Sequence, residues 1–254
     1  MFRNLYADVR SILLSRVFGL AMIFILVGQI LNLIVAKVIY YVIDANVAAE
    51  SIAYVYSSLA AFLVTAATLF ITDREFSNGC IRNKLISGVK RSDAFLSAVC
   101  GGVLQAVIYT MFACVVSLVL SKLFTLGFMI NTTSEIANRW LVTTMACVAI
   151  GVFSTSIVMM FGGNKASYVV GLFIAFAIKV WDTRILDKLY PDKGRCTLKG
   201  AELVIDRFID RYVPYSYLVE EPHYDMGSYI IGCSAMIIVS IVIGLIVFNK
   251  RDLK

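Results

Sequence analysis

Residues 73–91 read DREFSNGCIRNKLISGVKR, and this short basic stretch decides how the rest of the chain is interpreted. It lies between two long uncharged runs, at 52–72 and 94–121. A charged hairpin that returns the chain into a bilayer is poorly suited to catalysis, but it offers a surface to which a cytoplasmic partner can bind. We therefore expect the function to depend on this segment.

The composition is that of an integral membrane protein. Of the 254 residues, 60% are hydrophobic and 16% are charged, whereas soluble domains are about 25% charged. Five uncharged runs reach the ~20 residues of helix that cross a bilayer; they cover 17–36, 52–72, 94–121, 140–164 and 226–249. Apolar runs without alternation indicate helices and not a membrane barrel. The predicted fold class is therefore an all-α integral membrane protein.

A sixth, shorter run predicts a further span. Residues 166–178 form an uncharged core of 13 residues, below the usual ~17–25. Lys179 can extend toward the headgroups and Trp181 can lie at the interface, which lengthens the span. We therefore predict six spans in one transmembrane domain, at 17–39, 52–72, 94–120, 140–162, 166–181 and 227–248.

The distribution of basic residues predicts the orientation. The N-terminal segment, the 73–93 loop, the 162–165 turn and the C-terminal tail hold twelve Lys and Arg, against three in the two alternating loops. The positive-inside rule then places both termini and the 73–93 loop in the cytoplasm. The net charge of +6 follows from this orientation, so no nucleic-acid partner is predicted. Residues 1–16 are amphipathic, which favours an interfacial elbow helix over a frayed start to span one.

Residues 182–226 form the main polar segment and are predicted to be extracellular. An apolar pattern over 198–212 predicts a helix that ends before Pro214. This helix can cap a cavity, enter the outer leaflet or bind an external ligand, and capping is our preferred expectation. The pattern assigns no role to Cys196 or His223.

Signatures of enzyme chemistry are missing from the sequence. Residues 162–166 lack the spacing and hydroxyl of a phosphate-binding loop, and a lone His223 gives no zinc site. There is no HExxH or GxSxG motif, no CxxC pair and no carboxylate within the predicted spans. We therefore predict no catalytic residue, metal or cofactor in this chain, and a membrane enzyme is the least favoured reading.

Small and polar residues within the spans suggest where helices meet. A stripe in span two comprises Ala53, Ser57, Ala61, Thr65 and Thr68, and one in span five comprises Ser167, Gly171 and Ala175. Such stripes allow close helix approach, either between subunits along a translocation path or within one subunit. Gln29 and Asn32 in span one either hydrogen-bond to other helices or contact an amphipathic or lipophilic cargo.

Two segments resemble the membrane subunits of ABC-2 type exporters. The stretch Glu75-Phe76-Ser77-Asn78-Gly79-Cys80-Ile81-Arg82-Asn83-Lys84-Leu85-Ile86-Ser87-Gly88-Val89-Lys90-Arg91 is similar to that family's acidic residue, glycine, short helix, Leu-Ser-Gly and basic pair before span three. The end Phe248-Asn249-Lys250-Arg251-Asp252-Leu253 is similar to its basic tail. Cys80 departs from the pattern, since threonine is common there.

The resemblance implies a permease that has no motor of its own. In that family two permease subunits dimerise, and each binds an ATPase subunit that carries ATP and Mg. The loop between spans two and three is the coupling helix, a role that falls here on Gly79 through Ser87, with Glu75 bracing the loop beneath the membrane. Arg82 and Lys84 would meet acidic partner residues, and Ile81 and Leu85 would supply an apolar anchor. The coupling set is then Glu75, Gly79, Ile81, Arg82, Asn83, Lys84, Leu85 and Ser87.

The resemblance also suggests a cargo. Short family members without extra domains look most like bacterial plasma-membrane exporters or immunity transporters of amphipathic peptides. Lipid and drug exporters share the fold, and the partner permease can be a second copy or a related chain. An immunity or sensor protein that works without an ATPase is the alternative from another class.

Overall fold

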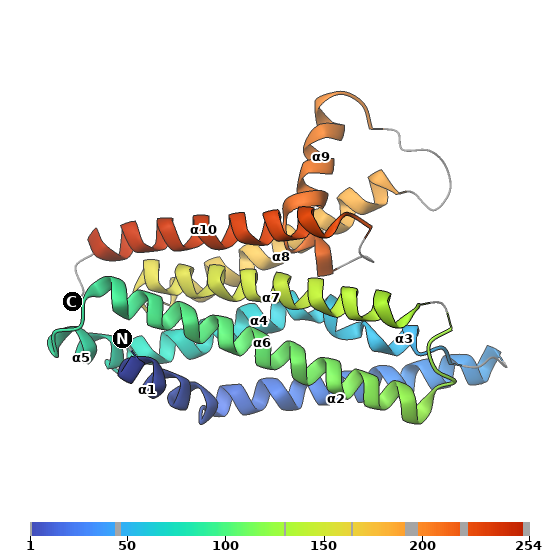
Figure 1. Cartoon of the computed structure of the whole chain (residues 1–254), viewed down its shortest axis with the longest axis horizontal. Coiled ribbons are helices and arrows are strands. Elements are labelled where there is room, and N and C mark those ends of the chain that lie inside the picture. The colour runs from blue at the N-terminus through green and yellow to red at the C-terminus, as the bar shows by residue number, and fades with distance from the viewer. Residues whose placement is uncertain are drawn as a thin grey trace.

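All regular secondary structure that the computed structural model describes is helical. It describes residues 2–43, 47–129, 131–163, 165–190, 198–218 and 223–250. Long helices run side by side and short ones lie at the two ends (Figure 1). In chain order they are α1 (Phe2–Leu13), α2 (Arg16–Ile43), α3 (Glu50–Ala53), α4 (Val55–Ser77), α5 (Cys80–Ile86), α6 (Arg91–Phe124), α7 (Thr133–Phe161), α8 (Ala166–Leu189), α9 (Ala201–Tyr212), η1 (Ser216–Leu218) and α10 (Met226–Lys250).

Five of these helices are long and apolar enough to cross a membrane: α2, α4, α6, α7 and α10. This agrees with a multi-pass, all-α membrane protein. α8 does not meet the same test of length and composition, although it runs from the end that holds the termini toward the opposite end (Figure 1). The sixth crossing therefore remains a prediction.

The helix boundaries extend the predicted spans. Span two begins with a separate short helix, α3, and α4 continues through Ser77, so Asp73 and Glu75 are helical residues and not loop residues. α8 likewise continues past residue 181 to Leu189. The helix expected over 198–212 forms as α9.

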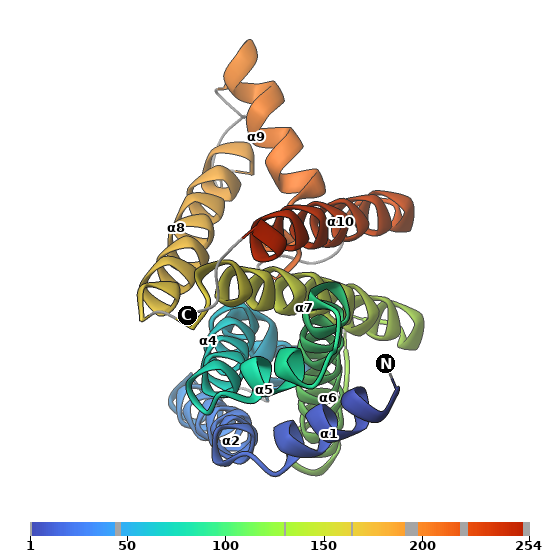
Figure 2. The same ribbon diagram turned by 90° about the vertical axis from the view of Figure 1, so that its left-hand side faces the viewer.

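α7 is the central helix of the bundle. It packs against α4, α6, α8 and α10, and Figure 2 shows it between α8 and α10 on one side and α4 and α6 on the other. Its contact with α6 depends on two glycines, because a Cβ at Gly151 would lie 2.9 Å from the carbonyl oxygen of Gly102. The missing side chains allow the two backbones to approach closely where lipid supplies no hydrophobic driving force.

The short helices at the termini end of the bundle position the candidate site. α1 packs mainly against α6, and α5 contacts α4 and α6. The ends of the chain and α5 lie together at this end of the bundle (Figure 1). That α1 lies on a membrane surface stays a prediction.

Candidate functional site

The candidate site is built around α5, whose shape is fixed by the residues at its two ends. Gly79 (φ 69°) precedes the helix and Gly88 (φ 88°) follows it, and both adopt the left-handed backbone that favours glycine. The amide of Asn83 donates to the carbonyl of Gly79 at 2.8 Å, and Ser87 Oγ donates to the carbonyl of Lys84 at 2.7 Å. These bonds produce the short helix between α4 and α6 that the sequence predicts.

One face of α5 belongs to the chain's own core. Ile81 is 1% exposed and joins an apolar cluster with Phe95 of α6 and Phe248 of α10. The rings of Phe95 and Phe248 are 6.0 Å apart. Ile81 therefore anchors α5 to the bundle and is not available as the apolar anchor for a partner that the resemblance implies.

A buried ion pair also holds the inward face of α5 against the bundle. Lys84 Nζ donates to Asp8 Oδ1 of α1 at 2.5 Å, and Ser97 Oγ of α6 donates to Asp8 Oδ2. Asp8 is 4% exposed. Glu75, buried at the end of α4, lies within electrostatic reach of both Asp8 and Lys84. The cluster therefore connects α1, α4, α5 and α6, and Lys84 faces a carboxylate of its own chain instead of a partner.

Sequence reasoning gave no role to Asp8 or Ser97. One signal for Asp8 was available, because it is the only acidic residue in the first 43 positions. A lone carboxylate within a basic amphipathic segment needs a cationic partner if it becomes buried. Nothing in the sequence marks Ser97, which is one of many serines in the apolar runs.

The opposite face of α5 is open. Arg82, Asn83 and Ile86 are exposed, Ile86 at 73%, whereas Leu85 is only partly exposed. A guanidinium, an amide and an aliphatic side chain on one short helix can contact an acidic and partly apolar surface. The predicted coupling residues thus divide into an inward set that positions the helix and an outward set that is free to bind.

The second segment of the resemblance lies beside the first. Arg91 Nη1, at the start of α6, donates to the carbonyl of Asn249 in the last turn of α10 at 3.1 Å. Phe248 lies in the same apolar cluster as Ile81. Residues 251–254, which complete the predicted basic tail, lie outside the described residues.

A further polar contact connects α4 to α8 near the same end. Tyr168 Oη donates to Asp73 Oδ2 at 2.5 Å, and Ser77 Oγ donates to the same oxygen at 3.4 Å. Gly163, with φ 72°, lies against Phe76 and leaves no room for a Cβ. The turn between α7 and α8 is thus packed directly on the end of α4 that leads into α5.

The two stripes of small residues pack within one chain. All eight predicted residues are buried: Ala53, Ser57, Ala61, Thr65, Thr68, Ser167, Gly171 and Ala175. A Cβ at Gly171 would lie 2.8 Å from Leu69 of α4, so the α8 stripe faces α4 directly. Of the two readings left open by the sequence, these contacts correspond to packing within a subunit, and a dimer through the same residues stays a prediction.

Some of the polar side chains in the spans hydrogen-bond between helices, and Gln29 is one of them. Gln29 Nε2 of α2 donates to the carbonyl of Ala113 in α6 at 3.1 Å. Gln29 also borders a crevice of about 10 Å³, roughly the volume of one water molecule. Asn32 is half-buried. Gln29 thus joins α2 to α6 in this structure. Contact of Gln29 or Asn32 with a cargo stays a prediction.

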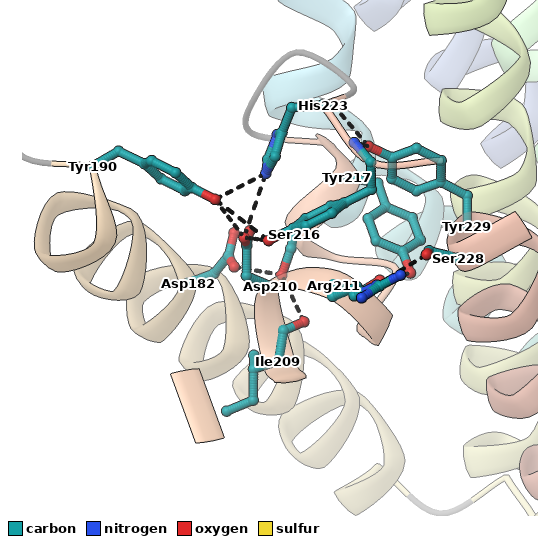
Figure 3. A network of polar contacts seen from close by, with 11 residues as sticks. Asp182, Tyr190, Ile209, Asp210, Arg211, Ser216, Tyr217, His223, Ser228 and Tyr229 are labelled. Atoms are coloured by element: carbon teal, nitrogen blue, oxygen red, sulfur yellow. Dashed lines mark hydrogen bonds and ion pairs between the residues drawn. The ribbon is translucent and has the colours of Figure 1, made fainter. Parts of the chain in front are cut away.

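A polar network at the other end of the bundle was not predicted (Figure 3). Its centre is Asp210 of α9, which is 3% exposed and accepts from Tyr224 Oη at 2.5 Å and from Tyr190 Oη at 3.4 Å. His223 Nε2 lies 3.5 Å from the same carboxylate oxygen. Burial, together with the hydrogen bond to Asp210, raises the pKa of Tyr224 above the ordinary tyrosine value, so this hydroxyl remains a donor.

Further hydrogen bonds at this end of the bundle join η1 to α8 and α9 to α10. Ser216 of η1 donates to Asp182 Oδ1 of α8 at 2.5 Å, and Arg211 Nε donates to Ser228 Oγ of α10 at 3.0 Å (Figure 3). His223, to which the sequence assigns no role, thus belongs to this network. Cys196 lies outside the described residues.

No group of three or more His, Cys, Asp or Glu within the described ranges is arranged to hold a metal ion. No protein-family model matches the chain, and no curated protein matches it either. The resemblance to exporter permeases therefore rests on the residues of this chain alone.

Proposed function

We propose that this chain is the permease subunit of an ATP-driven exporter. In this proposal a separate ATP-binding cassette ATPase carries ATP and Mg and binds the outward face of α5. The supporting observation is the division of α5 into a buried face, held by Ile81 and the Lys84–Asp8 pair, and an exposed face that presents Arg82, Asn83 and Ile86. A helix so tightly attached can transmit a displacement to the spans, whereas a mobile loop cannot.

The proposal includes six crossings in the plasma membrane of a bacterium, with α8 as the short fifth span and both termini in the cytoplasm. Two such subunits, identical or related, form the transporter with two ATPase subunits. The cargo we favour is an amphipathic peptide, because the apolar interior of the bundle suits a partly apolar substrate better than a strongly charged one. Lipid and drug cargoes are the alternatives within the same class.

The exposed arginine gives the most direct test. We expect Arg82→Glu to leave the chain folded and inserted while reducing ATPase binding by about tenfold, since it places a like charge opposite an acidic surface. The chain and candidate ABC ATPase subunits from the same organism would be co-purified and reconstituted, and both ATPase retention and ATP hydrolysis measured. Arg207→Glu, at another exposed arginine, on α9 at the opposite end of the bundle, is the matched control.

Cys80 supplies an independent check of orientation. It is exposed on α5, so a membrane-impermeant maleimide should label it in inverted vesicles and not in intact cells. The Cys80→Ser variant identifies which part of the signal comes from this residue. Labelling of Cys80 in intact cells, or equal ATPase retention by the Arg82 variant, would rule out coupling through α5. An ATPase-independent immunity or sensor protein would then be the better reading.

A further inference from the structure

α9 has its polar face turned inward and its apolar face turned outward. Asp206 and Asp210 are one helical turn apart and are 5% and 3% exposed. Val204, Ile205 and Phe208 lie on the opposite side of the helix and are 68%, 54% and 60% exposed. A helix on the surface of a soluble protein shows the reverse arrangement.

Specific contacts fix the inward face of α9, so the exposure of its apolar face does not result from a loosely attached helix. Asp210 accepts hydrogen bonds from Tyr224 and Tyr190, and Arg211 donates to Ser228. Lys188 of α8 forms an ion pair with Glu202 at 2.8 Å, on the rim of the same contact. These contacts determine which side of α9 meets the bundle.

The orientation of α9 also matters. Figure 1 shows α9 lying across the direction of the long helices, in the half of the bundle away from the termini and level with the start of α10. Figure 2, from the end of the bundle, shows it projecting sideways beyond α10. A helix perpendicular to membrane-spanning helices lies parallel to the membrane plane.

The exposed stripe of α9 is not the only apolar surface in this part of the molecule. α9 packs against α8 and α10. Both of those helices carry large exposed apolar side chains: Phe173, Phe176, Val180 and Trp181 on α8, and Ile230 and Ile231 on α10. Arg207 and Arg211 border the α9 stripe, where guanidinium groups can meet lipid phosphates.

We propose that α9 is an interfacial helix that inserts Val204, Ile205 and Phe208 into the leaflet remote from the termini, so that the membrane surface itself is its partner. A strongly amphipathic helix with basic residues beside its apolar face is the form that lies in a bilayer interface. The occupant is lipid, with the acyl boundary against Phe208 and anionic headgroups against the arginines. This inference does not depend on the chain being a transporter.

Tryptophan fluorescence in vesicles tests this directly. The two native tryptophans would be replaced (Trp140→Phe and Trp181→Phe), and a single indole introduced by Phe208→Trp or, as the matched control one position away, Arg207→Trp. The full chain would be reconstituted in phosphatidylcholine–phosphatidylglycerol vesicles that contain lipid brominated in the upper part of the acyl chain. Acrylamide serves as the aqueous quencher, and circular dichroism confirms that each variant is folded.

We expect bromolipid to quench the indole at position 208 at least about twofold more than the one at 207, with the opposite order for acrylamide. Stronger acrylamide quenching at 208 would mean that the stripe faces water. Protection from both quenchers would mean that a protein surface covers it, such as a second copy. Either result overturns the proposal.

Discussion

Replacing Lys84 by methionine should destabilise the chain because it leaves Asp8 charged and buried without its cationic partner. Asp8 is 4% exposed and the Lys84 side chain 16% exposed, so little solvent can take over from the ammonium group. Breaking a buried pair costs about 3–5 kcal/mol. We expect about 3 kcal/mol, at the lower end of that range, because the Ser97 hydroxyl still donates to the carboxylate.

A double-mutant cycle separates the pair from general damage. The free energy of unfolding would be measured by SDS titration in mixed micelles, followed by circular dichroism. Asp8→Asn with Lys84→Met should recover at least about 2 kcal/mol relative to Lys84→Met alone, since no buried charge remains. Lys90→Met, at an exposed lysine of the same loop, should have little effect. Equal destabilisation of the single and double variants would refute the buried pair as the bond that positions α5.

Two other substitutions test features that lie away from α5. Gly151→Ala should lower the free energy of unfolding by about 1–3 kcal/mol, because its Cβ would lie 2.9 Å from a carbonyl oxygen of α6. The control Gly19→Ala, whose Cβ would have no atom within 4 Å, should be neutral or stabilising. Equal effects of the two substitutions would mean that α6 and α7 separate easily. Asp210→Asn should speed amide hydrogen exchange across α9 by about tenfold, because the local stability of the helix falls by about 1.4 kcal/mol. The control Arg207→Gln should leave the exchange rates unchanged. Unchanged exchange in Asp210→Asn would show that the carboxylate does not hold the helix in place.

The spans could be predicted because their signal is local. Hydrophobic length alone identified the five helices that meet the membrane criterion, and α5 lies within the basic run 75–91, where the resemblance implies a short helix. The inward and outward faces of α5 could not be predicted from that run. Ile81 and Lys84 face inward only because Phe248, Phe95 and Asp8 come from distant parts of the chain.

In the segment at 182–226, too, the sequence predicts a helix but not which of its faces packs on the bundle. The apolar periodicity of 198–212 correctly predicts a helix, but it leaves open whether this helix caps a cavity, enters the outer leaflet or binds an external ligand. In the structure the acidic face packs inward, because Tyr190 at the end of α8 and Tyr224 before α10 donate to Asp210. Ser228 of α10 accepts from Arg211 of α9. Periodicity reports that a helix has two faces, but in a membrane it does not say which one meets the protein.

α10 joins the two ends of this molecule in a single element. Its first turn holds Ser228 and Tyr229 beside the Asp210 network, and its last turn holds Phe248 in the cluster that contains Ile81. Its 25 residues measure about 37 Å as a continuous α-helix. A tilt of so long a helix about Phe248 would shift Tyr229 sideways, so a change of packing beside α5 and a change in the Asp210 network would be coupled through α10.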